Sequence, residues 1–103
     1  MKAVHVLNER KIVGEDAFVE IAVWSVPRPV PGSMHGFKYS LVLVINHDCV
    51  LRYDNERGKG DHRHIGDQEF QYRFESLSNL PADFWNDVEA CIDEHRNLQR
   101  SLK

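Results

Sequence analysis

The chain has 103 residues, 42% of them hydrophobic and 28% charged, which suits one domain with a packed core and excludes a disordered protein. Thirteen Lys and Arg against sixteen Asp and Glu give a net charge of −3, which excludes a protein that coats nucleic acid through overall basic charge. The longest apolar run, residues 39–45, is too short to cross a bilayer, and the first ten residues lack the apolar core of a signal peptide. We therefore expect a soluble cytoplasmic protein that does not contact membranes.

The first third of the chain has the alternating apolar and polar residues that are typical of strands. We expect a short first strand or hairpin at residues 4–7 and 11–13, and a longer strand at residues 18–26, which are rich in β-branched and aromatic side chains. The proline-rich run at residues 27–32 is expected to be an extended connector, because proline fits neither a helix interior nor a central strand.

Residues 37–45 and 49–54 are expected to form a hairpin around the polar turn at residues 46–48. In this register Leu43 faces Leu51, and a slip by one residue would bring charged side chains to the core. The predicted apolar face consists of Tyr39, Leu41, Leu43, Ile45, Cys49, Leu51 and Tyr53. On the opposite face, Val42, Val44 and Val50 lie near the turn, and the polar residues Lys38, Ser40, Arg52 and Asp54 lie at the open end.

Residues 68–75 alternate cleanly and predict a last strand, and from Pro81 the apolar spacing changes to that of a helix of about four to five turns. The predicted helical stripe consists of Phe84, Val88, Cys91, Ile92, His95 and Leu98. We therefore expect one α+β domain over residues 1–103, an antiparallel sheet of about four or five strands with a C-terminal amphipathic helix packed on its apolar face. Cys49 and Cys91 are expected to be buried free thiols.

Chemically active side chains are most concentrated in residues 52–64, which hold four cations, three carboxylates, two histidines and two glycines. His62 and His64 are separated by one residue, so in an extended segment both rings point to the same side. Histidine titrates near neutral pH and can act as acid or base, as cleavage of RNA through its 2′-hydroxyl requires. This composition therefore favours a site that cleaves a phosphodiester.

In this hypothesis His62 and His64 are the acid and base of an endoribonuclease that needs no metal and no other cofactor. Asp54 or Asp61 orients a histidine, and Arg52 stabilises the charge of the transition state. The residues expected to bind the RNA are Lys38, Lys59, Arg63 and Asn55. Among the other histidines, only His35 is placed to reach this cluster.

Three further interpretations of the same segment stay open. Two histidines with a nearby aspartate are a feasible ligand set for zinc, iron or manganese, although the interleaved Arg57, Lys59 and Arg63 disfavour a dication. A glycine-rich charged segment is also typical of a solvated loop without a function of its own. Finally, the cations could simply hold phosphates in a non-catalytic module, with the region of Trp85 binding a protein partner.

Motifs over nearly the whole chain resemble the TumE family of toxin–antitoxin proteins. They are Trp24 with the proline-rich run, the stretch from His35 to Tyr39, the Arg-Tyr-Asp-Asn sequence at 52–55, the stretch from Gly58 to His64, Tyr72-x-Phe74, and the helix start at 80–84. The resemblance implies a small cytoplasmic toxin of a type II module that acts on RNA. It also implies an inhibiting antitoxin with a helix-turn-helix DNA-binding domain. Exposed sheet edges are compatible with a homodimer as well.

Overall fold

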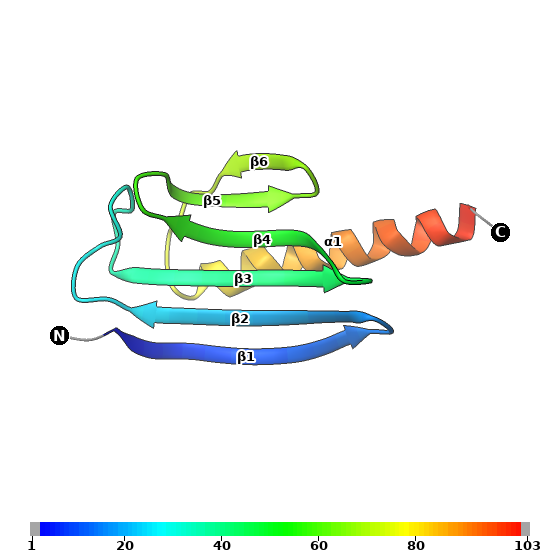
Figure 1. The fold of residues 1–103 in the computed structure, drawn as a ribbon, viewed down its shortest axis with the longest axis horizontal. Helices are drawn as coiled ribbons and strands as arrows, with labels where there is room; N and C mark the ends of the chain where they lie inside the picture. The colour runs from blue at the N-terminus through cyan, green and yellow to red at the C-terminus, as the bar shows by residue number, and fades with distance from the viewer. Residues whose placement is uncertain (1–2, 102–103) are drawn as a thin grey trace. The chain divides into compact units, whose positions relative to one another are not determined.

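The computed structural model describes residues 3–101, which form six β-strands followed by one α-helix (Figure 1). The elements are β1 (Val4–Gly14), β2 (Ala17–Ser25), β3 (Phe37–Ile45), β4 (Asp48–Glu56), β5 (Gly60–Ile65), β6 (Gln68–Gln71) and α1 (Asn79–Ser101). The strands form one antiparallel sheet in sequence order, from β1 to β6. The predicted α+β class is therefore confirmed, with slightly more strands than expected.

Two segments are more regular than their sequences suggested, and the second of them, β5, adds the unexpected strand. β1 is one continuous strand rather than two short pieces, and β5 forms within the glycine- and histidine-rich stretch that the sequence marked as a break. β6 ends at Gln71, earlier than residue 75, although the Tyr72 N–H still donates to the Asp61 carbonyl oxygen at 3.0 Å. Each strand pairs with the next along the chain, so hydrogen bonds to the strands on both sides can hold β5 extended despite the glycine at its start.

The β3–β4 hairpin differs from the prediction at its turn. Asn46 and His47 both have positive φ, 50° and 71°, as the two central residues of a tight two-residue hairpin turn require. The register then shifts between Leu43 and Val44, which places an extra residue in β4. Beyond this bulge, Leu43 pairs with Leu51 as the sequence predicted.

The bulge overturns the prediction for one cysteine. Cys49 pairs with Val44, a residue of the outer face, and its side chain is exposed instead of lying on the apolar face. Cys91, in α1, is half-buried, so neither cysteine is the fully buried thiol expected from the sequence. Both are free thiols, as predicted.

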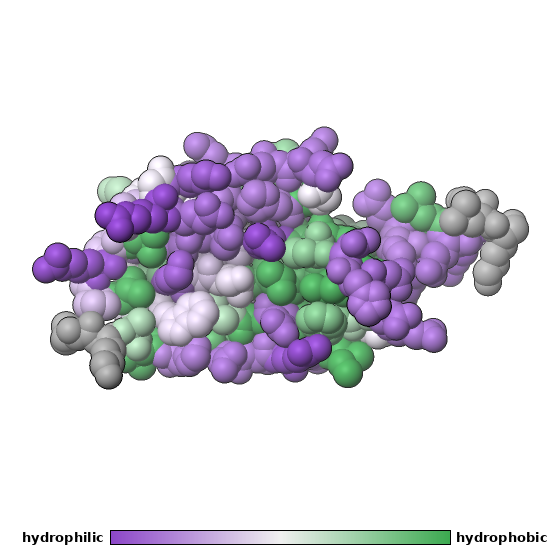
Figure 2. Space-filling model, viewed as in Figure 1, coloured by the Kyte–Doolittle hydropathy of each residue, from purple (hydrophilic) through white to green (hydrophobic). Residues whose placement is uncertain are grey.

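The two faces of the sheet have different side chains. One face, called here the core face, holds the most deeply buried apolar residues of the sheet, namely Val19, Ile21, Val23, Tyr39, Leu41, Leu43, Leu51 and Tyr53. On the opposite or outer face, Ser40 pairs with Asp54 and Val42 pairs with Arg52. Figure 2 shows hydrophilic residues gathered over β5 and β6 and an apolar area toward the β3–β4 turn. Ser40, Val42, Arg52 and Asp54 therefore share the outer face, as the sequence predicted.

The chain divides into two compact units, Met1–Arg73 with the sheet and Phe74–Lys103 with the helix. Helix α1 begins after Ser76, whose hydroxyl accepts a hydrogen bond from the Asn79 N–H at 3.0 Å. The most shielded helix residues, Leu80, Phe84 and Val88, follow the spacing of one helical face. That the helix packs on the sheet, and that residues 1–103 form a single domain, both stay predictions.

Candidate functional site

Strand β5 separates the predicted site residues between the two faces of the sheet. His62 pairs with Asp54, and His64 pairs with Arg52, so these four side chains share the outer face. Because side chains alternate along a strand, Asp61 and Arg63 lie on the core face. The expectation that the two histidine rings lie on the same side is met, and their centroids are 5.2 Å apart.

Glu69 completes a group of titratable side chains on the outer face. It lies on β6 directly opposite His64, and its Oε1 atom is 3.5 Å from the Nε2 atom of His62. We call Asp54, His62, His64 and Glu69 the outer-face cluster. Sequence reasoning missed Glu69, because its pairing partner lay in the segment read as a break. Side chains alternate between the two faces along the strand predicted at residues 68–75. Once β5 is known to be a strand, this alternation places Glu69 on the same face as His62 and His64.

The orientation of the His62 ring is fixed by the backbone. Its Nδ1 atom is 2.9 Å from the carbonyl oxygen of Gly60, and because a carbonyl only accepts, Nδ1 carries the proton of this hydrogen bond. The side chain is 4% exposed, and its Nε2 atom points at Asp54, with 3.7 Å between Nε2 and Oδ1. This distance is too long for a hydrogen bond, so His62 approaches both carboxylates without bonding to either.

Three buried polar atoms of the outer-face cluster have no hydrogen-bond partner within residues 3–101. They are Oδ1 of Asp54, Nε2 of His62 and Nε2 of His64. One potential ligand atom from each residue lies within 4.8 Å of those of the other two. An unsatisfied buried polar group costs about 1–3 kcal/mol, so a concentration of three is unusual and typical of a site that serves a ligand or a reaction.

Burial also changes the acidity of the cluster. Removal from water raises the pKa of Asp54, and the nearby His62 and Arg52 offset only part of this effect. A carboxyl in such an environment is stabilised by a proton or by a bound cation. Beside it, a pocket of about 360 Å³ is lined by Lys59, His62, Glu69, Phe70 and Gln71.

Asp61 belongs to a second polar group, on the core face. It accepts hydrogen bonds from the hydroxyls of Ser33 and Tyr39, the latter at 2.7 Å, and its Oδ2 atom lies 2.6 Å from Nε2 of His35. His35 therefore contacts Asp61 rather than the histidines of β5, and Asp61 faces away from His62 and His64. Burial, followed by the hydrogen bond to Asp61, raises the pKa of Tyr39 far above its ordinary value.

Asn55, on β4, binds Ser33 and the start of β3. Its side chain, in a residue that is 1% exposed, donates to the Phe37 carbonyl at 2.7 Å and accepts from the Tyr39 N–H at 3.0 Å. Gly32 and Gly60 meet so closely that a Cβ atom on Gly60 would lie 2.7 Å from the Gly32 carbonyl oxygen. The connector is thereby fastened to the start of β5, the strand that carries both histidines.

The predicted cations are distributed among different places. Lys38 pairs with Trp24 on the outer face, and Nζ of Lys59 lies 3.8 Å from a Glu56 carboxylate oxygen in the β4–β5 connection. Arg63 is on the core face, where it donates to the Tyr53 hydroxyl at 3.5 Å. Of the nine predicted site residues, the structure therefore unites Asp54, His62, His64 and Arg52 on one face, with Lys38 on the same face.

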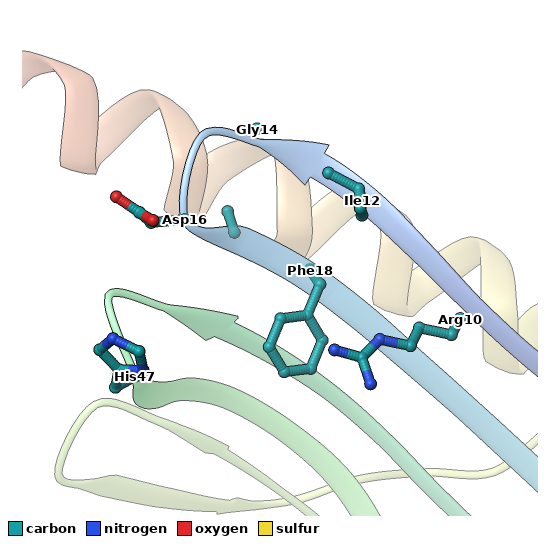
Figure 3. A pocket seen from close by; sticks show the side chains of 7 residues that line it. Arg10, Ile12, Gly14, Asp16, Phe18 and His47 are labelled. Atoms are coloured by element: carbon teal, nitrogen blue, oxygen red, sulfur yellow. The ribbon is translucent and has the colours of Figure 1, made fainter.

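A second pocket lies at the other end of the sheet, near the β1–β2 and β3–β4 turns (Figure 3). It has a volume of about 260 Å³ and is lined by Arg10, Ile12, Gly14, Asp16, Ala17, Phe18 and His47. The guanidinium of Arg10 lies 4.2 Å from the centre of the Phe18 ring, and Arg10 also pairs with Glu20 at 3.2 Å. The polar side chains that line this pocket are either paired with a neighbour, as Arg10 is, or exposed to solvent. This pocket is therefore a weaker candidate for the functional site than the outer-face cluster.

The fold and the cluster together define a small α+β protein with a histidine–carboxylate site on an open sheet face. A family model described as toxin TumE matches residues 3–92, and the chain therefore belongs to the TumE family. This confirms the resemblance seen in the sequence and makes the chain a toxin of a toxin–antitoxin system, for which an antitoxin partner is implied.

Comparisons with curated proteins and with solved structures gave no match. In the part of the chain that the structure describes, no helix is both long and apolar enough to cross a membrane.

Proposed function

We propose that this toxin cleaves RNA and that the reaction takes place at the outer-face cluster. The observation that carries the proposal is the convergence of three buried, unpartnered polar atoms, from Asp54, His62 and His64. Arg52 lies directly opposite His64, where a guanidinium can bind a phosphate. Imidazole, carboxylate and guanidinium on one face are the groups that phosphodiester cleavage needs.

The residue roles follow from position. In the metal-free reaction expected from the sequence, one histidine removes the 2′-hydroxyl proton and the other protonates the leaving 5′ oxygen. Asp54 stabilises the positive charge that forms on His62 when it takes up a proton, Arg52 stabilises the phosphorane charge, and Lys38 on the same face binds a flanking phosphate. Lys59 borders the adjoining pocket and is suited to the same task.

Three of the predicted site residues receive other roles. The amide of Asn55 and the carboxylate of Asp61 are engaged within the protein, and Arg63 lies on the opposite face. We therefore propose that Asn55 and Asp61 position the connector and the start of β5 rather than touch RNA. Arg63 is then a packing residue that contacts Tyr53.

The partner of the toxin is proposed to be an antitoxin with a helix-turn-helix DNA-binding domain, acting in the cytoplasm in a type II module. Co-expression of the two genes, with a tag on the toxin alone, is expected to yield a stable complex that binds the operator of the gene pair. Val4 and Val6 are exposed on the edge strand β1, which supports pairing of two copies through this edge. Light scattering on the purified toxin tests the dimer, and a monomer at all concentrations would exclude it.

The central test is cleavage of a labelled single-stranded RNA by the purified toxin and by the His62→Ala/His64→Ala double variant. The matched control is His95→Ala, a histidine on α1 whose Nε2 atom lies 3.2 Å from the Gln99 amide nitrogen. We expect cleavage by the wild type and the control, and a loss of at least a hundredfold in the double variant. Equal cleavage by all three proteins would show that the site is elsewhere.

A non-catalytic module gives a different result in the same experiment. RNA would then remain intact but bound, and the double histidine variant would bind as well as the wild type. Arg52→Ala would weaken binding and reduce its dependence on salt. That pattern would replace catalysis by binding as the function of this face.

A further inference from the structure

The environment of His62 is unfavourable as it stands. Its Nδ1 atom donates to the Gly60 carbonyl, so the neutral ring presents a lone pair at Nε2. That lone pair faces two carboxylate oxygens, Oδ1 of Asp54 at 3.7 Å and Oε1 of Glu69 at 3.5 Å. Three electron-rich atoms at these distances repel one another unless a positive charge lies among them.

We propose that the outer-face cluster binds one divalent transition-metal ion, with Asp54, His62 and His64 as ligands and Glu69 as the fourth. A histidine that binds a metal through one ring nitrogen commonly donates the other N–H to a backbone carbonyl, and His62 does so to Gly60. The unpartnered atoms Oδ1 of Asp54 and Nε2 of both histidines are then the ligand atoms.

The ligand atoms lie near enough for a single ion once their side chains move closer together. Bonds of about 2.0–2.2 Å from a tetrahedral zinc to nitrogen or oxygen place two ligand atoms about 3.3–3.6 Å apart. The potential ligand atoms of Asp54, His62 and His64 all lie within 4.8 Å of one another, and those of Glu69 and His62 lie 3.5 Å apart. A separation at the 4.8 Å limit must shorten by about 1.2–1.5 Å, which rotation of the side chains about their χ angles can supply.

The sheet holds these ligands on three neighbouring strands. Asp54 on β4 lies directly opposite His62 on β5, and His64 on β5 lies directly opposite Glu69 on β6. A site on paired strands is held by the hydrogen bonds of the ladder, which limits the entropy lost when the ion binds. Glu69 is the flexible member, with a side chain that is 49% exposed at the open side of the site.

Of the interleaved cations that disfavoured a metal in the sequence, Arg63 faces away from this site, and Lys59 borders only the adjoining pocket. Arg63 contacts Tyr53 on the core face, Lys59 lies near Glu56, and Arg57 is exposed in the β4–β5 connection. Two imidazoles with one or two carboxylates suit zinc, manganese or ferrous iron better than magnesium, which prefers oxygen ligands only. Arg52 remains near His64 and is suited to a phosphate bound beside the ion.

This inference concerns binding and stands whether or not RNA is the substrate. When a metal is bound, it supplies Lewis-acid chemistry and lowers the pKa of a coordinated water. An ion at this site would make RNA cleavage metal-dependent, in contrast to the metal-free reaction expected from the sequence.

The test is metal binding by untagged protein that has been stripped with EDTA and dialysed. Titration with Zn²⁺ and Mn²⁺, followed by calorimetry, is expected to give one site per chain, with Mg²⁺ bound much more weakly. Asp54→Asn and His64→Ala are expected to weaken Zn²⁺ binding at least a hundredfold, and Glu69→Gln about tenfold or more. The control His95→Ala is expected to bind as the wild type does.

Absence of a site, or equal affinity in all variants, would overturn the proposal. Urea unfolding of each variant shows whether it is folded. If His64→Ala does not fold, Glu69→Gln still tests the proposal, because the Glu69 side chain is half-exposed and its replacement should not disturb the fold. Repeating the RNA assay in EDTA separates the two proposals. Failure of Zn²⁺ and Mn²⁺ to bind, with RNA still cleaved, overturns the metal site alone, whereas bound metal without cleavage overturns the proposed function alone.

Discussion

Gly60 lies where the start of β5 meets the proline-rich connector, and an added methyl group would have no space there. Its φ is +75°, and a Cβ atom would lie 2.7 Å from the backbone carbonyl oxygen of Gly32. Gly58 is a matched comparison in the same connection, with φ of +83° and nothing within 4 Å of the position a Cβ atom would take. The two alanine variants therefore share the backbone conformation and differ in the available space.

The expected costs follow from these geometries. A left-handed backbone costs a residue with a side chain about 1–2 kcal/mol, and the lower entropy of the unfolded chain returns about 0.4–1 kcal/mol on replacing glycine. Gly58→Ala should therefore lower the free energy of unfolding by about 1 kcal/mol. Gly60→Ala adds an overlap with backbone that cannot rotate away, at about 1–3 kcal/mol, for a total of about 2–4 kcal/mol.

Urea unfolding followed by circular dichroism measures the free energy of unfolding of both variants and of the wild type. An unchanged dependence of this free energy on urea concentration shows that all three proteins undergo the same unfolding transition. Gly60→Ala should also disturb the neighbouring His62, since the ring hydrogen bond of His62 is to the Gly60 carbonyl. Equal stability of the two alanine variants would refute the close approach of Gly32 to Gly60, and with it the account of how the connector is fastened.

Three other predictions concern the core face and the thiols. Burial raises the pKa of Tyr39 above its ordinary 10.0, so above that pH the unfolded phenol loses its proton while the folded one keeps it. Above pH 10 the free energy of unfolding of the wild type should therefore fall with pH about 1.4 kcal/mol per pH unit more steeply than that of Tyr39→Phe. Urea unfolding from pH 9 to 11 measures both, and an equal dependence on pH in the two proteins would contradict this. Asn55→Ala removes the hydrogen bonds to the Phe37 carbonyl and from the Tyr39 N–H and should cost about 2–4 kcal/mol by the same method, whereas a loss under about 1 kcal/mol would show that these bonds are replaced. Cys49 is exposed, whereas burial raises the pKa of Cys91, so a thiol reagent should modify Cys49 several-fold faster than Cys91 at pH 8. Cys49→Ser should remove the faster of the two phases of the modification reaction.

The sequence by itself determined the features that depend on local periodicity. The alternation of residues 37–45 and 49–54 predicted the hairpin and the pairing of Leu43 with Leu51, and the change of spacing near Pro81 predicted the helix. The separation of His62 from His64 by one residue placed both rings on one face, because a strand has a side-chain period of two. The motifs over the whole chain also carried the resemblance to the TumE family, which the family match confirms.

Only the tertiary structure decided which groups meet. Cys49 is exposed because of the two-residue turn at Asn46 and His47 and the bulge that follows it. The bulge adds one residue to β4, and one added residue moves a side chain to the other face of the sheet. β5 turns Asp61 toward His35 and away from His62, and β6 brings in Glu69. These outcomes depend on the register between strands, which is set by hydrogen bonds and packing across the whole sheet. Residue spacing along one strand predicts which face a side chain takes, and the pairing of neighbouring strands decides its partners.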